Sequence, residues 1–233
     1  MTLADTVEEK IKAVLAPAFV EVDGRRVPET EDVNLTSGAV VLDATYLYAD
    51  MADSTGLAQR YKKHVVAKII RCYLSAATTI IKDRGGAIRS FDGDRVMGIF
   101  YGPSKNSNAA KAALNISWAV EKAIRPRIKD KWNDLDWTLT HGIGVDTGEA
   151  WLVRGGVWGT NDLVSIGRAP NIAAKLSELR GRGQVMITSD VYNKLSDDSK
   201  YTNGTDMWKP KGTIELGGTV LRYYSSTYWW KPA

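Results

Sequence analysis

The apolar positions along the chain follow two periods, one typical of strands and one typical of helices. Ala39 to Tyr48 is largely apolar, interrupted by Asp43 and Thr45, and predicts a strand with Asp50 at its end. Leu57 to Arg84 carries apolar or small residues every three or four positions. This spacing predicts a long amphipathic helix that packs on a sheet.

Turn signals divide the middle of the chain into a hairpin and a second helix. Residues 92–94 read Asp-Gly-Asp and separate two short strand-like runs, Ala87 to Phe91 and Arg95 to Phe100. This pattern predicts a tight hairpin turn that holds Asp94. The segment from Asn106 to Ile128 has an alanine-rich apolar face and predicts the next helix.

The second half of the chain predicts two more hairpins with a helix between them. Trp137 to Val145 and Ala150 to Val153 have the character of strands, joined by a turn at Gly148. Ala169 to Leu179 predicts a helix. The remaining predicted elements are a strand at Val185 to Thr188, a short helix at Ser189 to Leu195 and a hairpin from Thr213 to Tyr224. The order indicates an α+β fold, one sheet with helices on one face.

The first residues have a different character from the rest. Pro17, Pro28 and the charges from Asp23 to Asp32 predict an irregular lead-in. We therefore expect an N-terminal arm over residues 1–37 and a single folded domain over residues 38–233.

Composition narrows the class of protein. The 233 residues are 44% hydrophobic and 25% charged, which is typical of a soluble globular protein. The net charge of +4 is spread along the chain, so a nucleic-acid track is not expected. Cys72 is the single cysteine, and no run approaches the roughly 20 apolar residues of a membrane span. We expect a cytoplasmic protein without a nucleic-acid or membrane partner.

Two carboxylates indicate the chemistry. Asp50 and Asp94 both fall at strand ends of an antiparallel sheet, where neighbouring strands can bring them into one metal site. Two carboxylates with few other ligands suit Mg²⁺ or Mn²⁺, which keep positions open for water and phosphates. Ser54 or Thr55 predicts the N-cap of the next helix, whose N–H groups would face the same rim. The alternative for each carboxylate is an ordinary solvated turn residue.

Four segments, in order, resemble the motifs of class III nucleotidyl cyclases. Residues 48–55 resemble the first metal motif, and residues 93–100 resemble the second. Residues 142–149 resemble the family's Gly-Ile hairpin, and residues 166–176 resemble its Gly-x-x-x-Asn-x-Ala-x-Arg helix except at the last position. The resemblance covers residues 38–225.

The resemblance implies a ferredoxin-like core that works as a head-to-tail homodimer, with the nucleotide between subunits. Asp50 and Asp94 would bind two divalent metal ions, Mn²⁺ or Mg²⁺, and the backbone carbonyl of Met51 would assist. Asn171 from the other subunit would orient the ribose. Lys175 stands where the family has the arginine that contacts the α-phosphate.

Lysine at this position keeps the charge but loses the bidentate fork of arginine. The role therefore stays with Lys175 or passes to Arg168 or Arg180. A triphosphate-binding lysine is expected late in the chain, and Lys209 and Lys211 are equal candidates.

The departures from the family bear on the base. Adenylate cyclases read the purine with Lys and with Asp or Thr at the positions of Ser90 and Val164, and guanylate cyclases have Glu and usually Cys there. A site without those polar groups discriminates purines poorly. The pattern is most similar to the bacterial Pycsar cyclases, anti-phage enzymes that make cyclic UMP or cyclic CMP. Arg89, Ser90, Phe91 and Val164 are the candidate base-pocket residues.

The resemblance thus implies a lyase that converts UTP into 3′,5′-cyclic UMP and pyrophosphate, with a separately encoded effector that binds the product. The alternatives are a cytidylate cyclase that makes cyclic CMP, an adenylate cyclase with atypical base recognition, and a non-catalytic nucleotide-binding module.

Overall fold

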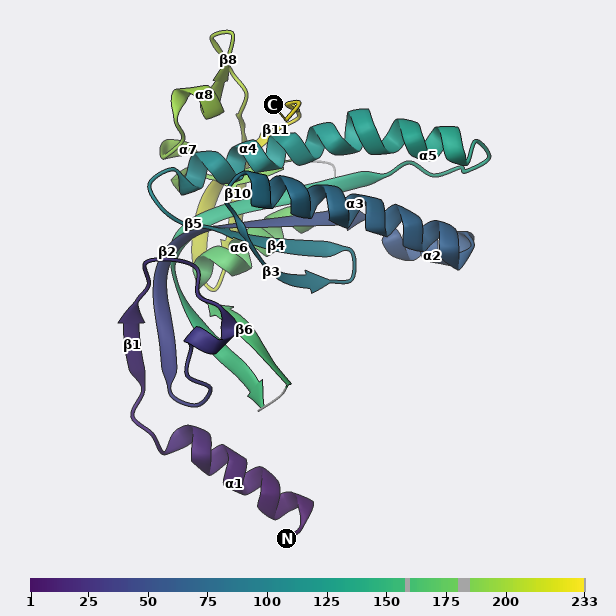
Figure 1. Ribbon diagram of the computed structural model, residues 1–233. Helices are drawn as coiled ribbons and strands as arrows, with labels where there is room; N and C mark the ends of the chain where they lie inside the picture. The colour runs from purple at the N-terminus through teal and green to yellow at the C-terminus, as the bar shows by residue number, and fades with distance from the viewer. Residues whose placement is uncertain (158–159, 180–184, 233) are drawn as a thin grey trace. The chain divides into compact units, whose positions relative to one another are not determined.

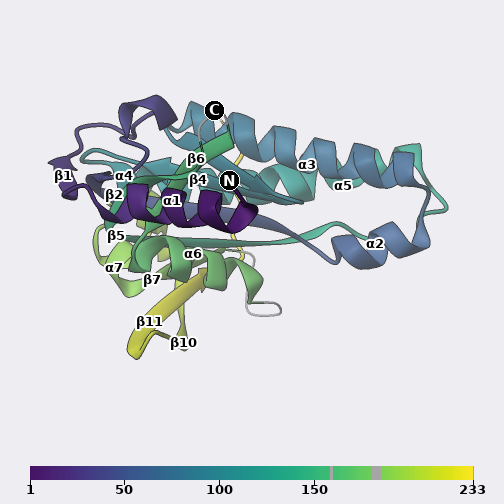
Figure 2. The same ribbon diagram turned by 90° about the horizontal axis from the view of Figure 1, so that it is seen from below.

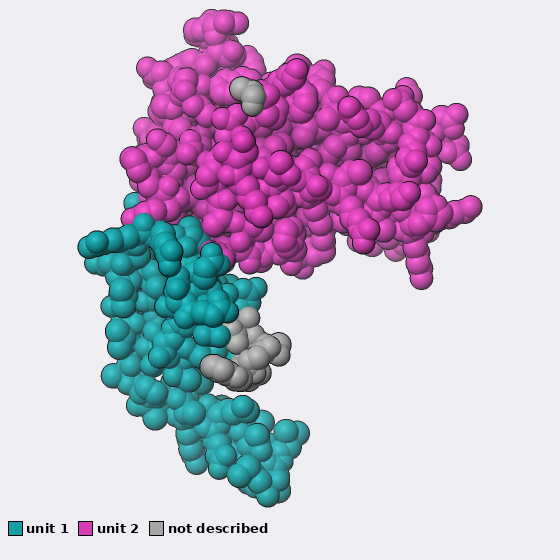
Figure 3. Space-filling view, viewed as in Figure 1, with its two compact units in different colours: residues 1–43, 148–168 teal, residues 44–147, 169–233 magenta. Residues whose placement is uncertain are grey.

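The computed structural model describes residues 1–157, 160–179 and 185–232 (Figure 1). The chain divides into two compact units, which Figure 3 shows in two colours. Unit 1 contains residues 1–43 and 148–168, and unit 2 contains residues 44–147 and 169–233. The predicted domain boundary after residue 37 stays a prediction.

Unit 2 is organised by a mixed sheet with the strand order β10-β11-β7-β5-β2-β4-β3. The β2–β4, β3–β4, β7–β11 and β10–β11 pairs are antiparallel, and β5–β7 is parallel. The strands are β2 (Gly38–Ala52), β3 (Ala87–Asp92), β4 (Arg95–Phe100), β5 (Thr140–Val157), β7 (Val185–Thr188), β10 (Lys209–Leu216) and β11 (Thr219–Ser226). The predicted α+β fold is confirmed.

One face of this sheet packs against α3 (Lys63–Asp83) and α4 (Lys105–Trp118). The core between them takes alternate residues of each strand, because successive side chains of a strand point to opposite faces. These buried sheet residues include Leu47, Ala49, Val96, Phe100, Ile143, Val145, Val185 and Ile187.

The other face of the sheet packs against α6 (Arg168–Glu178) (Figure 2). Val185 and Ile187 belong to the core under α3 and α4. Met186, which lies between them in the chain, packs with Ile172 and Leu176 of α6 on the other face. Gly144 makes this contact possible, since a Cβ there would lie 2.0 Å from the carbonyl oxygen of Ala173. The expectation that all helices lie on one face was therefore wrong for α6.

The first predicted helix is divided in two. The structure has α2 (Ser54–Arg60) and α3, separated by Tyr61 in an extended conformation with φ −125° and ψ 161°. The predicted cap at Ser54 or Thr55 is wrong, because Asp53 is the N-cap residue and has φ 58°. The Asp53 side chain makes no cap hydrogen bond and pairs with Arg60 at 2.9 Å. With a carboxylate at its N-cap position, the start of α2 does not have the character of the predicted anion-binding helix start.

The second predicted helix changes its winding near its end. It consists of α4, the π-helix η2 (Ala119–Ile124) and α5 (Arg125–Lys131). Pro126 lies in the first turn of α5. Because proline lacks the N–H that would continue an α-helical ladder, a local shift of the hydrogen-bond pattern before it is expected.

The predicted turn at Gly148 is also wrong. β5 is one continuous strand through that residue, and Ala150 and Leu152 beyond it are buried while Glu149 is exposed. The alternation of a strand therefore persists past the glycine. β5 pairs antiparallel with β6 (Thr160–Ile166) in unit 1.

The N-terminal segment of unit 1 is regular, not irregular as expected. It forms α1 (Leu3–Leu15), β1 (Val20–Asp23), which pairs parallel with β2, and the 3₁₀-helix η1 (Thr30–Asp32). A capping box starts α1: the Thr2 N–H donates to Asp5 Oδ2 at 2.7 Å, and the Asp5 N–H donates to Thr2 Oγ1 at 3.2 Å. Phe19 stacks on Trp151, with ring centroids 5.8 Å apart.

The small elements that complete unit 2 are α7 (Ser189–Asn193), α8 (Asp197–Lys200), β8 (Tyr201–Thr202) and β9 (Thr205–Asp206). Among the described residues, α3 is the one helix long and apolar enough to cross a membrane by length and composition. Its Ile69, Tyr73, Ala77 and Ile81 are fully buried against the sheet. A core helix has the same character.

Candidate active site

Asp50 lies near the end of β2, and Asp94 lies in the turn that precedes the neighbouring strand β4. In the β2–β4 register Asp50 is paired with Arg95, and Asp94 is the residue before Arg95. Asp94 occupies the two-residue turn between β3 and β4, where Gly93 has φ 61°. A glycine with positive φ at the first turn position is typical of a tight type II′ hairpin. The turn chemistry thus fixes Asp94 beside the end of β2.

The pleat of β2 separates the site from the core. Leu47, Ala49 and Met51 are buried beneath α3 and α4, so Tyr48 and Asp50 face the opposite side of the sheet. The Met51 side chain belongs to the core, which leaves its backbone carbonyl for the site. Asp50 and Tyr48 are half-buried.

An orphaned carboxylate oxygen marks the site as suited to a cation. Asp94 Oδ2 is buried and has no hydrogen-bond partner among the described residues. Burial of an unpartnered charged oxygen is costly, and a divalent ion would remove that cost. The described residues contain no cluster of three or more His, Cys, Asp or Glu side chains that could hold a metal. Two neighbouring carboxylates, one with a buried and unpartnered oxygen, fit Mg²⁺ or Mn²⁺, which bind through few protein ligands and keep open positions for substrate oxygens.

Arg95 is a site residue that the sequence analysis did not single out. Its guanidinium donates to Asp92 at 2.8 Å and to Glu178 at 3.0 Å, and lies 5.4 Å from the centre of the Tyr48 ring. Burial lowers the pKa of Arg95, but the Asp92 hydrogen bond and the charges of Asp92, Asp50 and Glu178 outweigh it and raise that pKa. Arg95 therefore stays charged beside Asp50 and ties β4 to the end of α6.

Tyr48 completes this local environment. Burial raises the pKa of its phenol, the nearby Arg95 charge lowers it, and Asp92 raises it, so the net shift is upward. Tyr48 is accordingly neutral, with its ring against a permanent cation. Tyr48 lies on the face of the sheet that carries Asp50, and is not part of the core under α3 and α4.

The β3 candidates for base recognition separate onto two faces. Ser90 pairs with Met97, which in turn pairs with Tyr48, so these three residues form a row on the Asp50 side of the sheet. Phe91 pairs with Val96 of the core under α3, and is 56% exposed on that other face. Arg89 is the bulged residue between Ile88 and Ser90. The structure thus groups Ser90, but not Phe91, with the carboxylates.

Asn171 and Lys175 are exposed and lie one turn apart on α6, on the face away from the sheet. Their neighbours Ile172, Ala173 and Leu176 are buried against the sheet. This packing presents both polar side chains outward, where a nucleotide or a second subunit could reach them.

The late lysines differ in their backbone setting. Both are exposed on β10, but Lys209 pairs with Ser225 whereas Lys211 falls at the bulge between Pro210 and Gly212. A bulge interrupts the backbone hydrogen bonds of the strand pair and changes the direction in which a side chain points. Lys211 is therefore the one of the two lysines that the bulge can redirect.

The remaining predicted residues belong to unit 1 or lie outside the description. Val164 is 49% exposed and paired with Val153 in the β5–β6 hairpin. Arg168 is half-buried at the first position of α6. Arg180 lies outside the described residues.

The relatives of the chain are nucleotidyl cyclases. It is 40% identical to a uridylate cyclase of Rhodovulum sp. (strain MB263) over 238 residues, covering 100% of this chain and 99% of the relative. It is 42% identical to a uridylate cyclase of Burkholderia cepacia, covering 99% of each chain. No family model matches the sequence.

Solved structures show the same fold. The adenylyl cyclase CyaB from P. aeruginosa aligns with a TM-score of 0.65 at 23% identity, covering 81% of this chain and 95% of that one. The guanylyl cyclase Cya2 aligns with a TM-score of 0.68 at 18% identity, covering 83% of this chain and 96% of that one. The predicted class III fold is confirmed. The chain belongs to the family of the uridylate cyclases and has the class III cyclase fold.

Proposed function

We propose that the protein is a uridylate cyclase that converts UTP into 3′,5′-cyclic UMP and pyrophosphate. The ribose 3′-oxygen forms a bond to the α-phosphorus, the bond from that phosphorus to the bridging oxygen breaks, and the hydroxyl proton leaves to solvent. The names of the relatives that cover the whole chain support the choice of UTP.

The buried, unpartnered Oδ2 of Asp94 is the observation that carries the proposal. Asp94, Asp50 and the Met51 carbonyl would hold two divalent ions, Mn²⁺ or Mg²⁺, as the cyclase resemblance implies. When bound, such ions stabilise charge on the phosphates and favour ionisation of the attacking hydroxyl. The protein's own contribution is to fix the two carboxylates at the end of β2 and in the β3–β4 turn.

Residues of α6 would position the nucleotide. Asn171 would orient the ribose, and Lys175 would contact the α-phosphate with a single charge instead of a bidentate fork. Both side chains point away from the sheet of their own chain, which supports a role for them toward a second subunit. We therefore propose a homodimer with the nucleotide between subunits.

Ser90 supports a base other than a purine. The position that carries a purine-reading Lys or Glu in the related cyclases has a short neutral hydroxyl here, on the same face as Asp50. We retain Ser90, Arg89 and Val164 as base-pocket candidates. Cyclic CMP is the second candidate product, because the same absence of purine contacts favours either pyrimidine.

The cellular role follows from the Pycsar resemblance. We propose a cytoplasmic enzyme of anti-phage defence, whose cyclic nucleotide is bound by a separately encoded effector. Enzyme and effector need not touch, because a diffusible product connects them.

The test is to incubate the purified protein with Mn²⁺ and, in separate tubes, UTP, CTP, ATP and GTP, and to identify products by mass spectrometry. We expect cyclic UMP from the UTP tube. Cyclic CMP as the single product would show that the substrate is CTP and not UTP. Cyclic AMP would overturn the interpretation of Ser90. Metal-dependent UTP binding without pyrophosphate release would instead indicate a non-catalytic module.

A further inference from the structure

The first helix exposes an apolar stripe. Leu3, Val7, Ile11, Val14 and Leu15 follow helical spacing, and their exposed fractions run from 48% for Val7 to 81% for Leu3. None of the thirteen residues of α1, all of them described, is buried. A contiguous exposed stripe of this kind is typical of an interaction surface.

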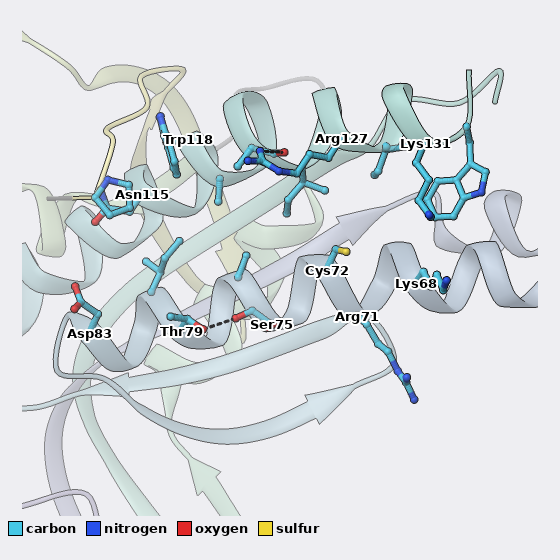
Figure 4. Close-up of a pocket in the computed structure, with 18 residues that line it drawn as sticks. Lys68, Arg71, Cys72, Ser75, Thr79, Asp83, Asn115, Trp118, Arg127 and Lys131 are labelled. Carbon is cyan, nitrogen blue, oxygen red and sulfur yellow. Dashed lines mark hydrogen bonds between the residues drawn. The ribbon is translucent and has the colours of Figure 1, made fainter. Parts of the chain in front are cut away.

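A groove in unit 2 has the matching character. It lies between α3 on one side and α4, η2 and α5 on the other, with a volume of about 880 Å³ (Figure 4). Its apolar lining includes Ala76, Ile80, Trp118, Ile124, Ile128 and Trp132. The π-helix η2 forms part of the wall, and such segments occur frequently at functional sites.

The charges of the groove are polarised. Among the described residues, four cations line it, Lys68, Arg71, Arg127 and Lys131, and one carboxylate, Asp83. Lys68 and Lys131 lie at one end and Asp83 at the other, as Figure 4 shows. Lys68 makes no hydrogen bond or ion pair within the part of the chain that the structure describes. The groove thus combines an apolar floor with a cationic end that is open to an acidic partner.

The charges of α1 are polarised in the complementary sense. Its acidic residues Asp5, Glu8 and Glu9 precede its basic residues Lys10 and Lys12. The helix has 13 residues and is therefore about 20 Å long. The groove follows α3 for roughly 22 Å, the rise of the fifteen residue steps between its two charged ends. Length, apolar character and charge order agree.

We propose that α1 docks in the α3/α4–α5 groove of a second copy of the chain, with Val7 near the cationic end. Helix and groove are present on every copy, so two copies related by a two-fold axis can make this contact twice and close. The inference rests on the homodimer of the proposed function and adds a contact to it.

Cys72 provides the test, because it lines the groove one helical turn from Lys68 and is the single cysteine in the chain. A Val7→Cys variant under mild oxidation should form a covalent dimer on a non-reducing gel. Glu9→Cys, on the polar face of α1, and Val14→Cys, about 10 Å further along the helix, are matched controls and should cross-link at least five-fold more slowly. Cys72→Ser in the Val7→Cys background should abolish the dimer band.

The charge order is tested in the same assay. Lys68→Glu should slow cross-linking of Val7→Cys about two- to five-fold, as for loss of an exposed ion pair, and Glu8→Lys should restore it. Unchanged cross-linking in Lys68→Glu would contradict the proposed orientation.

The outcomes that overturn the docking are distinct from failure of the homodimer. A disulfide within one chain would exclude the second copy as occupant, and equal rates for Glu9→Cys and Val7→Cys would exclude the apolar face. Light scattering of the reduced protein separates the remaining cases. A dimer without the cross-link overturns the α1 contact alone, whereas a monomer overturns the homodimer as well. Cyclase activity of the reduced Val7→Cys protein reports on the reaction independently.

Discussion

The two faces of the unit 2 sheet carry opposite chemistry on the same strands. Along β2, Leu47 and Ala49 lie fully buried under α3 and α4, while Tyr48 and Asp50 face the other side. Along β4, Val96 belongs to the core and Arg95 to the polar face. One strand therefore builds the core and the candidate site with alternate residues.

The difference shows why this site is well defined despite its position at a strand end and a turn. The core fixes the register of β2 and β4, since a slip by one residue would move Asp50 into the core. The same register pairs Asp50 with Arg95, and so brings Asp94, the residue before Arg95, beside Asp50. The position of Asp94 therefore does not depend on a contact between the two carboxylates. Changes on the polar face should affect activity, and changes on the apolar face should affect stability.

The largest expected effect is on the polar face. Asp94→Asn should lower cyclisation of UTP at least about a thousand-fold, because the amide is a poor ligand for a divalent ion. The far-ultraviolet spectrum and the unfolding midpoint without metal should stay close to those of the unchanged protein. Asp92→Asn, an exposed carboxylate two residues away in the same hairpin, is the control and should keep most activity. Activity of Asp94→Asn near that of Asp92→Asn would contradict the metal assignment.

On the apolar face the expected effect is on stability. Leu47→Ala should lower the free energy of unfolding by about 2–5 kcal/mol, because Leu47 is fully buried and its truncation leaves a cavity. Chemical denaturation measures this loss. A cost below about 1 kcal/mol would show that this face is not the rigid core that sets the register.

The contact of α6 with the polar face depends on a missing side chain. Gly144→Ala should cost about 1–3 kcal/mol of unfolding free energy, because the added methyl group would meet the backbone of α6 at Ala173 and Ser177. Gly155→Ala is the control, because a Cβ there would meet only a side chain, at 3.0 Å. Gly85→Ala is unsuited, because the φ of 80° at Gly85 would strain any other residue. Equal stabilities for Gly144→Ala and Gly155→Ala would contradict the close approach.

Arg95 should tune the metal site with little effect on stability. Its partners Asp92 and Glu178 are largely exposed, so Arg95→Gln should change unfolding free energy by less than about 1 kcal/mol. Removal of a cation beside Asp50 should lower the Mn²⁺ concentration for half-maximal activity by about two- to five-fold. A higher Mn²⁺ requirement would indicate that Arg95 supports the carboxylates instead of competing with the metal.

The two late lysines should differ in their effect on the KM for UTP. Lys211→Ala should raise the KM for UTP about three- to ten-fold with little change in kcat. The bulge redirects the Lys211 side chain, which makes Lys211 the better candidate to contact the triphosphate. Lys209→Ala is its matched control on the same strand. A larger effect of Lys209→Ala would reverse the assignment.

The sequence predicted those parts of the site that depend on local patterns. The apolar run ending at Asp50 and the Asp-Gly-Asp turn placed both carboxylates at neighbouring strand ends. Arg95 could not be found in this way, because its contact with Glu178 joins residues 83 positions apart. The face on which Phe91 lies likewise depends on its pairing with Val96.

The helix errors have local causes. The capping box of Thr2 and Asp5 and the apolar spacing of α1 were present in the sequence, but the prolines that follow drew the segment toward an irregular assignment. The break at Tyr61 has no glycine or proline to signal it. Gly148 was a false turn signal, because glycine is also tolerated within a long strand.

The most direct test of the metal site is a titration of the protein with Mn²⁺ without nucleotide, followed by electron paramagnetic resonance of the free ion, because UTP would itself bind Mn²⁺ and be turned over. We expect Asp92→Asn to bind Mn²⁺ within about three-fold of the unchanged protein, because Asp92 acts on the site through Arg95 and is exposed, and Asp94→Asn to bind it at least ten-fold more weakly. Equal affinity in all three proteins would contradict the account, because the buried oxygen of Asp94 would then have no metal to hold.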